Sequence, residues 1–316
     1  AFVFICSGFM GYGVVRHWNR ADYDGTYVIA VLPFKIIGGS ELAYLESGLV
    51  EMVSRNIDGA AGLRAVSPDM VLTYAKEKSA TSPTEELADK MSARFLVTGN
   101  VTQSGEQIRV TATLHDFKKS AGDPVVVEGH KDQLFSIVDK LSAQLLAATR
   151  KGQDARLSQS AAITTNSLPA LRKYLQGEDY YRRTLYDSAV SQFSDAVAID
   201  STFALAYYRL ALAQINNSGF VESRASIERG IRHSERLVER DQSLLRALSE
   251  IINGRYEAAE GIYRALLQQY PGDMEATFLL AETLYSVNGF RGRPAKEAVP
   301  LIAQVEAADP EFLCPI

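Results

Sequence analysis

The residues best suited to chemistry in this sequence do not form a catalytic or metal-binding pattern. The histidines are His17, His115, His130 and His233. They lack the ligand spacing of a zinc site such as H-E-x-x-H. Gly11 and Gly13 flank one tyrosine, but a dinucleotide loop needs a third glycine between a strand and a helix. Because G-x-S-x-G, P-loop and kinase signatures are also missing, we expect no enzyme, catalytic residue, metal or cofactor.

A second group of residues could act by contact instead of catalysis. Tyrosine and arginine side chains contribute strongly to protein–protein interfaces. Such residues occur in two segments with helical periodicity, as Tyr174, Tyr181, Tyr207, Tyr208 and Arg209. We predict that these five residues form a protein-binding surface, although some of the tyrosines must also belong to the core.

A charged cluster follows these tyrosines in the sequence. Its members are Glu250, Glu257 and Glu260, with Arg246 and Arg255. A mixture of both signs at helical spacing is typical of a solvated helix face. We therefore interpret the cluster as exposed surface without a specific function.

Composition restricts the class of protein further. The chain has 316 residues, of which 47% are apolar and 22% charged, and its formal net charge is −5. This length predicts about two domains, and the negative charge excludes the basic footprint of a nucleic-acid-binding protein. Cys6 and Cys314 lie at opposite ends of the chain, so a disulfide framework is excluded.

The N-terminal segment predicts a membrane anchor. The first fifteen residues carry no charge, and Arg16 and Trp18 follow at the expected membrane interface. A span needs about 20 residues, so we expect residues 1–20 to be a transmembrane helix truncated at its N-terminus. Bilayer contact would involve residues 1–18. A signal peptide is the alternative, but it would show a basic start and a small-x-small cleavage site.

Small residues would lie along this anchor helix. Ser7, Gly8 and Gly11 leave nearly bare backbone that another membrane helix could approach closely. Glycine is also common in any membrane helix. These residues therefore indicate either a helix-packing surface or only the ordinary composition of a membrane helix.

The segment 26–150 predicts a mixed α/β sheet domain. Its expected strands are 27–34, 63–67, 94–102, 107–115 and 124–128, and its expected helices are 41–57, one beginning near 82, and 134–149. Residues 27–34 form a continuous apolar run, which is typical of a strand buried on both faces. Residues 103–106 contain a glycine and should form the turn of a β-hairpin.

Several of these segments resemble a known domain. The stretches VIAVLPF, ESGLVEMVSRNI, LRAVSP and ARFLVTGNVTQSGEQIRVTATLHD are similar to the TolB N-terminal-like domain of bacterial membrane-anchored signalling proteins. The resemblance covers roughly residues 27–150. It implies a domain outside the inner membrane that has a binding or packing role.

The C-terminal part contains an internal repeat. A small residue, a large residue, a second small or apolar residue and a helix stop recur at intervals of four, three and five positions. The three copies are Ala189, Phe193, Ala196 and Ser201; Ala259, Tyr263, Leu266 and Pro271; and Ala298, Ile302, Val305 and Pro310. A small residue allows two antiparallel helices to approach, and the large side chain fills the adjacent space.

This pattern resembles the tetratricopeptide repeat (TPR) family. Departures from the family pattern are the missing tryptophans, Ser201 in place of proline, and a blurred copy at 218–237. We expect three or four divergent repeats over residues 168–312, joined to the first domain by a polar linker at 151–167. The expected fold class is therefore α+β, with a transmembrane helix, a mixed α/β sheet domain and all-α TPR-like repeats.

Two functions fit these features. The first is a non-catalytic scaffold or accessory subunit, anchored in the bacterial inner membrane as a single-pass protein with periplasmic domains, that binds protein partners in a larger membrane complex. The alternative is the extracytoplasmic sensor of a transmembrane receptor with a kinase, cyclase or DNA-binding output domain. The resemblance to signalling proteins favours the receptor. A chain that begins within an apolar helix favours the membrane complex.

Overall fold

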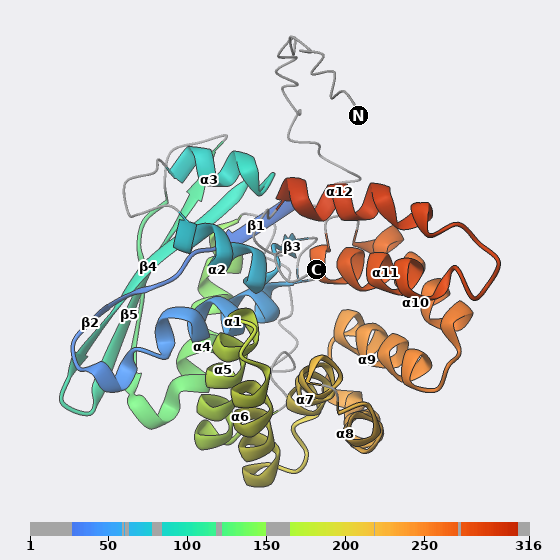
Figure 1. Ribbon diagram of the computed structural model, residues 1–316. Helices are drawn as coiled ribbons and strands as arrows, with labels where there is room; N and C mark the ends of the chain where they lie inside the picture. The colour runs from blue at the N-terminus through green and yellow to red at the C-terminus, as the bar shows by residue number, and fades with distance from the viewer. Residues whose placement is uncertain are drawn as a thin grey trace, which may run out of the picture.

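The computed structural model describes residues 27–58, 60, 63–77, 84–117, 122–149, 165–217, 219–270 and 273–308 (Figure 1). The predicted membrane helix lies outside this part of the chain, as do its residues Ser7, Gly8, Gly11, Arg16 and Trp18. Among the residues described, no helix combines the length and the apolar character that a membrane span requires. An α/β domain comes first along the chain, and an array of helices follows it.

The α/β domain contains one mixed sheet. Its described strands are β1 (Tyr27–Val31), β2 (Lys35–Ile37), β3 (Leu63–Ala65), β4 (Phe95–Ser104), β5 (Gln107–Asp116) and β6 (Val125–His130). They are ordered β3-β1-β4-β5-β6, and β2 pairs with β4. β1 runs parallel to β3 and β4, whereas β5 is antiparallel to β4 and β6. The mixed sheet predicted from the sequence is therefore confirmed.

The strands follow the burial that their sequences predict. Ile29, Ala30 and Val31 of β1 are completely buried, because helices cover both faces of the sheet at this strand. The β4–β5 hairpin turns at Gly105, whose φ of 61° lies in the left-handed region that glycine adopts at little cost. Local sequence is thus sufficient to specify the centre of the sheet.

Helices cover the two faces of the sheet. They are α1 (Leu45–Ile57), α2 (Pro68–Glu77), α3 (Thr84–Lys90) and α4 (Leu134–Ala148), with short 3-10 helices at η1 (Ser40–Leu42) and η3 (Lys131–Gln133). α1 and α4 share one core with Ile29 and Val97, whereas α2 and α3 pack with Ala30 and Leu96 in a second core. The sequence analysis did not predict α2.

The rest of the described chain is a helix array. Its members are α5 (Leu168–Arg182), α6 (Tyr186–Ile199), α7 (Ala204–Asn216), α8 (Phe220–Arg232), α9 (Glu239–Ile252), α10 (Tyr256–Gln269), α11 (Met274–Val287) and α12 (Val299–Ala308), with 3-10 helices η5 (Ser234–Arg236) and η6 (Ala295–Ala298). Consecutive helices pack as the pairs α5–α6, α7–α8, α9–α10 and α11–α12. The described residues therefore form four helix pairs, which agrees with the upper end of the predicted number.

Small and large side chains alternate along the seam of each pair. The predicted residues Ala189, Phe193, Ala196, Ala259, Tyr263, Leu266, Ala298 and Val305 are buried, and Ile302 is half-buried. In the second pair the same positions are taken by Ser223, Ile227 and Gly230, all buried. In the first pair a Cβ atom on Gly177 would lie only 2.5 Å from the Phe193 ring, so this close packing requires glycine. Pro271 and Pro310 lie outside the described residues.

The array follows an arc around the α/β domain (Figure 1). The first helices of the pairs are α5, α7, α9 and α11. α5, α7 and α9 contact α1 or α2 directly, and α11 contacts Arg209 of α7. We call the surface formed by these four helices the inner face.

Candidate protein-binding face

α1 and α2 cover the N-terminal halves of the helices that form the inner face. A Cβ atom on Gly48 of α1 would lie 2.7 Å from Leu175 Cδ1 of α5, which shows how closely these helices approach. One guanidinium–ring contact supports the same junction, because the guanidinium of Arg172 lies 4.8 Å from the ring centre of Tyr44. A second such contact, at 4.5 Å, joins Arg64 of β3 to Tyr270 at the end of α10. The array therefore holds a helical segment of its own chain.

Buried charges cross this junction between α1 and α9. Arg55 Nε lies 2.8 Å from Glu51 Oε1, and the same guanidinium forms an ion pair with Asp241. The hydroxyl of Tyr174 donates a hydrogen bond of 3.3 Å to Glu51 Oε1. These side chains are at most 7% exposed, so water screens the ion pairs weakly.

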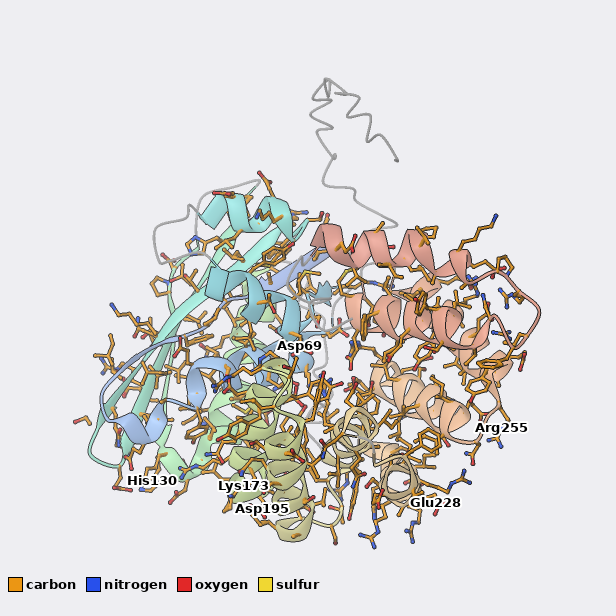
Figure 2. The ribbon with its side chains drawn as sticks, viewed as in Figure 1. Asp69, His130, Lys173, Asp195, Glu228 and Arg255 are labelled. Carbon is orange, nitrogen blue, oxygen red and sulfur yellow. The ribbon has the colours of Figure 1, made fainter. Side chains whose placement is uncertain are left out.

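Arg209 of α7 lies at the centre of this network. Its three guanidinium nitrogens lie 3.0 Å from Glu178 Oε1, 3.0 Å from Glu275 Oε1 and 3.1 Å from Asp69 Oδ2. Asp69 belongs to α2 and also pairs with Arg182 at 3.4 Å. Figure 2 shows Asp69 near the middle of the molecule, between α2 and the array. One arginine thus joins α5, α7 and α11 to the α/β domain.

Arg240 extends the network along α9 and α11. It contacts Asp273 at 2.6 Å, Glu275 at 2.8 Å and Asp241 at 2.9 Å. Asp273 also caps α11, because its carboxylate accepts a 3.0 Å hydrogen bond from the Ala276 amide. The Asp273 carboxylate therefore has two roles: it caps α11, and it takes part in the ion-pair network at the junction.

The network changes the ionisation of its carboxyl groups in opposite directions. Burial disfavours the charged form of Glu275, but Arg209 and Arg240 outweigh it and lower the pKa of this group to about 2. Burial dominates at Glu178 and raises its pKa to about 8, with only partial compensation from Arg209. The Arg209 Nε and Glu178 Oε1 atoms lack a hydrogen bond despite their short separation, which is consistent with a weakly stabilised carboxylate.

The structure places the predicted binding residues mostly in the interior. Tyr174, Tyr207, Tyr208 and Arg209 are at most 4% exposed, so the expectation that they present an open surface is wrong for these four. Tyr174, Tyr208 and Arg209 belong to the buried network, whereas the Tyr207 Cβ packs 3.3 Å from the position of a Cβ on Gly230. Binding of a separate protein by these residues stays a prediction.

Tyr181 differs from the other four because it is half-buried. It lies at the C-terminal end of α5, next to Arg182, whose guanidinium pairs with Asp69 of α2. Exposure rises along α11 from Glu275, at 9%, through the half-buried Phe278 to the exposed Glu282 and to Tyr285, at 60%. We call the surface formed by Tyr181, Phe278, Glu282 and Tyr285 the open half of the inner face. Sequence reasoning missed all of these residues except Tyr181.

The charged cluster predicted on α9 and α10 is only partly solvated. Glu257 and Arg255 are exposed, as expected. Glu260 is instead 7% exposed and binds Arg264, Arg291 and Arg293 at 2.8, 2.9 and 2.7 Å. These arginines hold the insertion between α11 and α12, so the interpretation of Glu260 as a solvated residue is wrong.

The described histidines have local partners. His115 lies 2.9 Å from Thr98 Oγ1, and His130 lies 3.3 Å from Asp132. His233 ends α8, and His17 lies outside the described part. Within the described ranges, no group of three or more His, Cys, Asp or Glu residues is placed to hold a metal ion.

Comparison with known proteins identifies part of the array. Residues 240–283 match the model of the tetratricopeptide repeat family. No curated protein matches the sequence. Among solved structures, the chain is similar to YrrB, described as a TPR protein with an unusual peptide-binding site, at 19% identity and a TM-score of 0.30. That match covers 57% of this chain and 84% of YrrB. The helix array therefore contains a tetratricopeptide repeat, which spans α9, α10 and most of α11.

Proposed function

We propose that this protein is a non-catalytic scaffold or accessory subunit that binds a partner protein. The inner face of the array carries this proposal, because it already holds α1 and α2 of its own chain through close packing and buried ion pairs. A surface with these properties can hold a segment of another protein beside them. The tetratricopeptide match at 240–283 supports the same role, since such repeats stack into extended binding surfaces.

The proposal extends to a location at a membrane. The uncharged residues 1–15, followed by Arg16 and Trp18, support a single-pass anchor in a bacterial inner membrane. The resemblance of residues 27–150 to the TolB N-terminal-like domain supports a periplasmic position for the α/β domain and the array. Together they would brace a partner within a larger membrane complex.

The same resemblance favours a second candidate function. Here the described domains are the extracytoplasmic sensor of a receptor whose output domain is a kinase, a cyclase or a DNA-binding domain. The two candidates differ in what lies upstream of residue 1, and in whether a separate partner is bound.

Site-specific crosslinking in native membranes tests the scaffold. A photo-reactive amino acid would replace Tyr285, which is 60% exposed on the open half, and the control would carry it at Val221, which is 82% exposed on α8. We expect one partner to crosslink at 285 and not at 221, and to co-purify in a fixed ratio with the unmodified protein. Carbonate washing should leave the protein in the membrane.

Two results would reject this function. A protein that purifies alone and crosslinks equally at both positions has no specific partner on the inner face. A chain continuous with a cytoplasmic output domain, and without a stable partner, would establish the receptor instead. If carbonate washing released the protein from the membrane, the proposed anchor would be rejected, but the proposed binding of a partner would stand.

A further inference from the structure

The open half of the inner face contains a cluster of tyrosines around one glutamate. Tyr181 at the end of α5 and Tyr186 at the start of α6 pack edge to face, with ring centres 5.5 Å apart. Glu282 of α11 is close enough to interact electrostatically with both hydroxyls and with that of Tyr263 on α10. We call these four residues the tyrosine–glutamate cluster. It combines helices from the first, third and fourth pairs, and so exists only in the folded array.

Tyr263 contributes an unused polar atom to this cluster. Its side chain is completely buried, and among the described residues its hydroxyl has no hydrogen-bond partner. Leaving a buried hydroxyl unpaired costs free energy, and native proteins keep few such groups. The corresponding hydroxyl of Tyr208 has a partner, since it donates a 3.1 Å hydrogen bond to Glu275. The Tyr263 hydroxyl is therefore a polar group in the buried part of the cluster whose hydrogen-bonding capacity the described residues do not use.

Glu282 contributes an unused charge. The buried carboxylates of the inner face, such as Glu275 and Asp241, each have an arginine partner. Glu282 forms no ion pair with any described residue, although the surrounding protein disfavours its charged form and raises its pKa. Its side chain is nevertheless exposed, so a cation can reach it from outside. The carboxylate is thus accessible and has no counter-ion.

The buried ion-pair network has more acids than bases. It contains four arginines, Arg55, Arg182, Arg209 and Arg240, and six carboxyl groups, Glu51, Asp69, Glu178, Asp241, Asp273 and Glu275, of which Glu178, with its pKa raised to about 8, carries little charge at neutral pH. Glu282 adds a further negative charge at the accessible end. A positively charged partner is attracted to such a surface, and a negatively charged one is repelled.

We propose that the tyrosine–glutamate cluster receives a lysine or arginine side chain from an extended segment of the partner protein. The aromatic rings of Tyr181 and Tyr186 attract the cation, and the Glu282 carboxylate pairs with it. Half-buried Phe278 precedes Glu282 by four positions on the same face of α11 and contacts the apolar neighbours of that side chain. This inference rests on the proposed function and specifies the chemistry of the partner.

Peptide selection on the purified full chain tests this specificity. A displayed library of random dodecapeptides would be selected on the wild-type protein, on Glu282→Gln and on the control Glu228→Gln. Glu228 is exposed on α8, at the outer edge of the molecule (Figure 2). We expect lysine or arginine at one fixed position of the peptides enriched on the wild type and on the control. Selection on Glu282→Gln should lose this preference.

Binding constants then give the size of the effect. The best-enriched peptide would be labelled and titrated by fluorescence anisotropy, together with a version carrying norleucine in place of its selected cation. We expect norleucine and Glu282→Gln each to weaken binding at least tenfold, with no further loss when they are combined. Glu228→Gln should bind as the wild type does. Unchanged melting temperatures of both variants would show that folding is not the cause.

Three outcomes would overturn the proposal. They are a library that enriches no peptide, enrichment without lysine or arginine, and cation-dependent binding that Glu282→Gln leaves intact. In each case a partner that still crosslinks at position 285 would leave the scaffold function standing. Loss of that crosslink as well would reject both.

Discussion

Asp69 Oδ2 of α2 and Arg209 Nη2 of α7 lie 3.1 Å apart, although 140 positions separate the two residues in the sequence. This ion pair joins the sheet domain to the middle of the helix array. Because the same arginine binds Glu178 and Glu275, it also fixes the relative positions of α5, α7 and α11. This buried charge therefore couples the two parts of the chain, together with the Arg55–Asp241 pair.

Replacement of Arg209 by methionine tests this coupling. The side chain of methionine fills similar space, but Glu178 loses its arginine partner, Glu275 keeps only Arg240, and Asp69 keeps only Arg182. Removing one partner of a buried ion pair costs about 3–5 kcal/mol, so we expect a large fall in the urea midpoint. Arg255→Met is the matched control, because Arg255 pairs with Glu250 at the exposed surface. Equal midpoints for the two variants would show that Arg209 does not hold the parts together.

The sequence predicted best those features that depend on neighbouring residues. The apolar run of β1, the glycine turn of the β4–β5 hairpin and the small–large–small seam at Ala189, Phe193 and Ala196 are local patterns, and the structure confirms them. α2 was missed because Pro68 was interpreted as the end of a strand. Proline is equally favourable in the first turn of a helix, and here it begins one.

The candidate site could not be predicted in the same way. Tyr174, Tyr208 and Arg209 have the residue types of an exposed binding surface, and the local sequence gives no sign that α1 and α2 cover them. Three of their charged partners, Glu51, Glu275 and Asp69, lie more than 60 positions away in the sequence. One signal was available for the open half. Glu275, Phe278 and Glu282 share one face of a helix by their spacing, which predicts that they line the same surface.

Two tyrosines allow a direct comparison of a paired and an unpaired hydroxyl. Tyr208→Phe removes a buried hydrogen bond to a carboxylate and should destabilise the protein by about 1.5–3 kcal/mol. Tyr263→Phe removes a hydroxyl without a partner among the described residues, and should leave stability unchanged or raise it by about 1 kcal/mol. Chemical denaturation measures both. A loss of stability in Tyr263→Phe as large as in Tyr208→Phe would show that its hydroxyl has a partner.

Glycine positions in the array test the packing of the first helix pair. In Gly177→Ala the new methyl group would lie 2.5 Å from the Phe193 ring, and overpacking of this kind costs about 1–3 kcal/mol. Gly261→Ala is the control on α10, where a new Cβ meets nothing within 4 Å. It should stabilise the protein by about 0.5–1 kcal/mol, since alanine favours the helix more than glycine does. The melting temperature should therefore fall in Gly177→Ala and rise in Gly261→Ala. Shifts of the same sign would contradict the close contact between Gly177 and Phe193.

The pH dependence of stability should report on Glu178. Its pKa in the folded protein is raised to about 8 from the ordinary value of 4.5, so between these values the folded state binds more protons than the unfolded state. Its contribution to the free energy of unfolding is therefore complete below pH 4.5 and is lost as the pH rises to 8. The lowered pKa of Glu275, about 2, acts in the opposite sense, and its contribution is lost only as the pH falls below 4.5.

Glu178→Gln isolates this effect, because glutamine mimics the protonated carboxyl group at every pH. We expect the unfolding free energy of the wild type, measured relative to the variant, to fall steadily from pH 5 to pH 8.5. Glu228→Gln, which changes an exposed carboxylate on α8, should give a curve parallel to that of the wild type. A difference between wild type and Glu178→Gln that stays constant across this range would mean that Glu178 is ionised in the native protein. Arg209 would then be surrounded by three ionised carboxylates at the junction between the two parts of the chain.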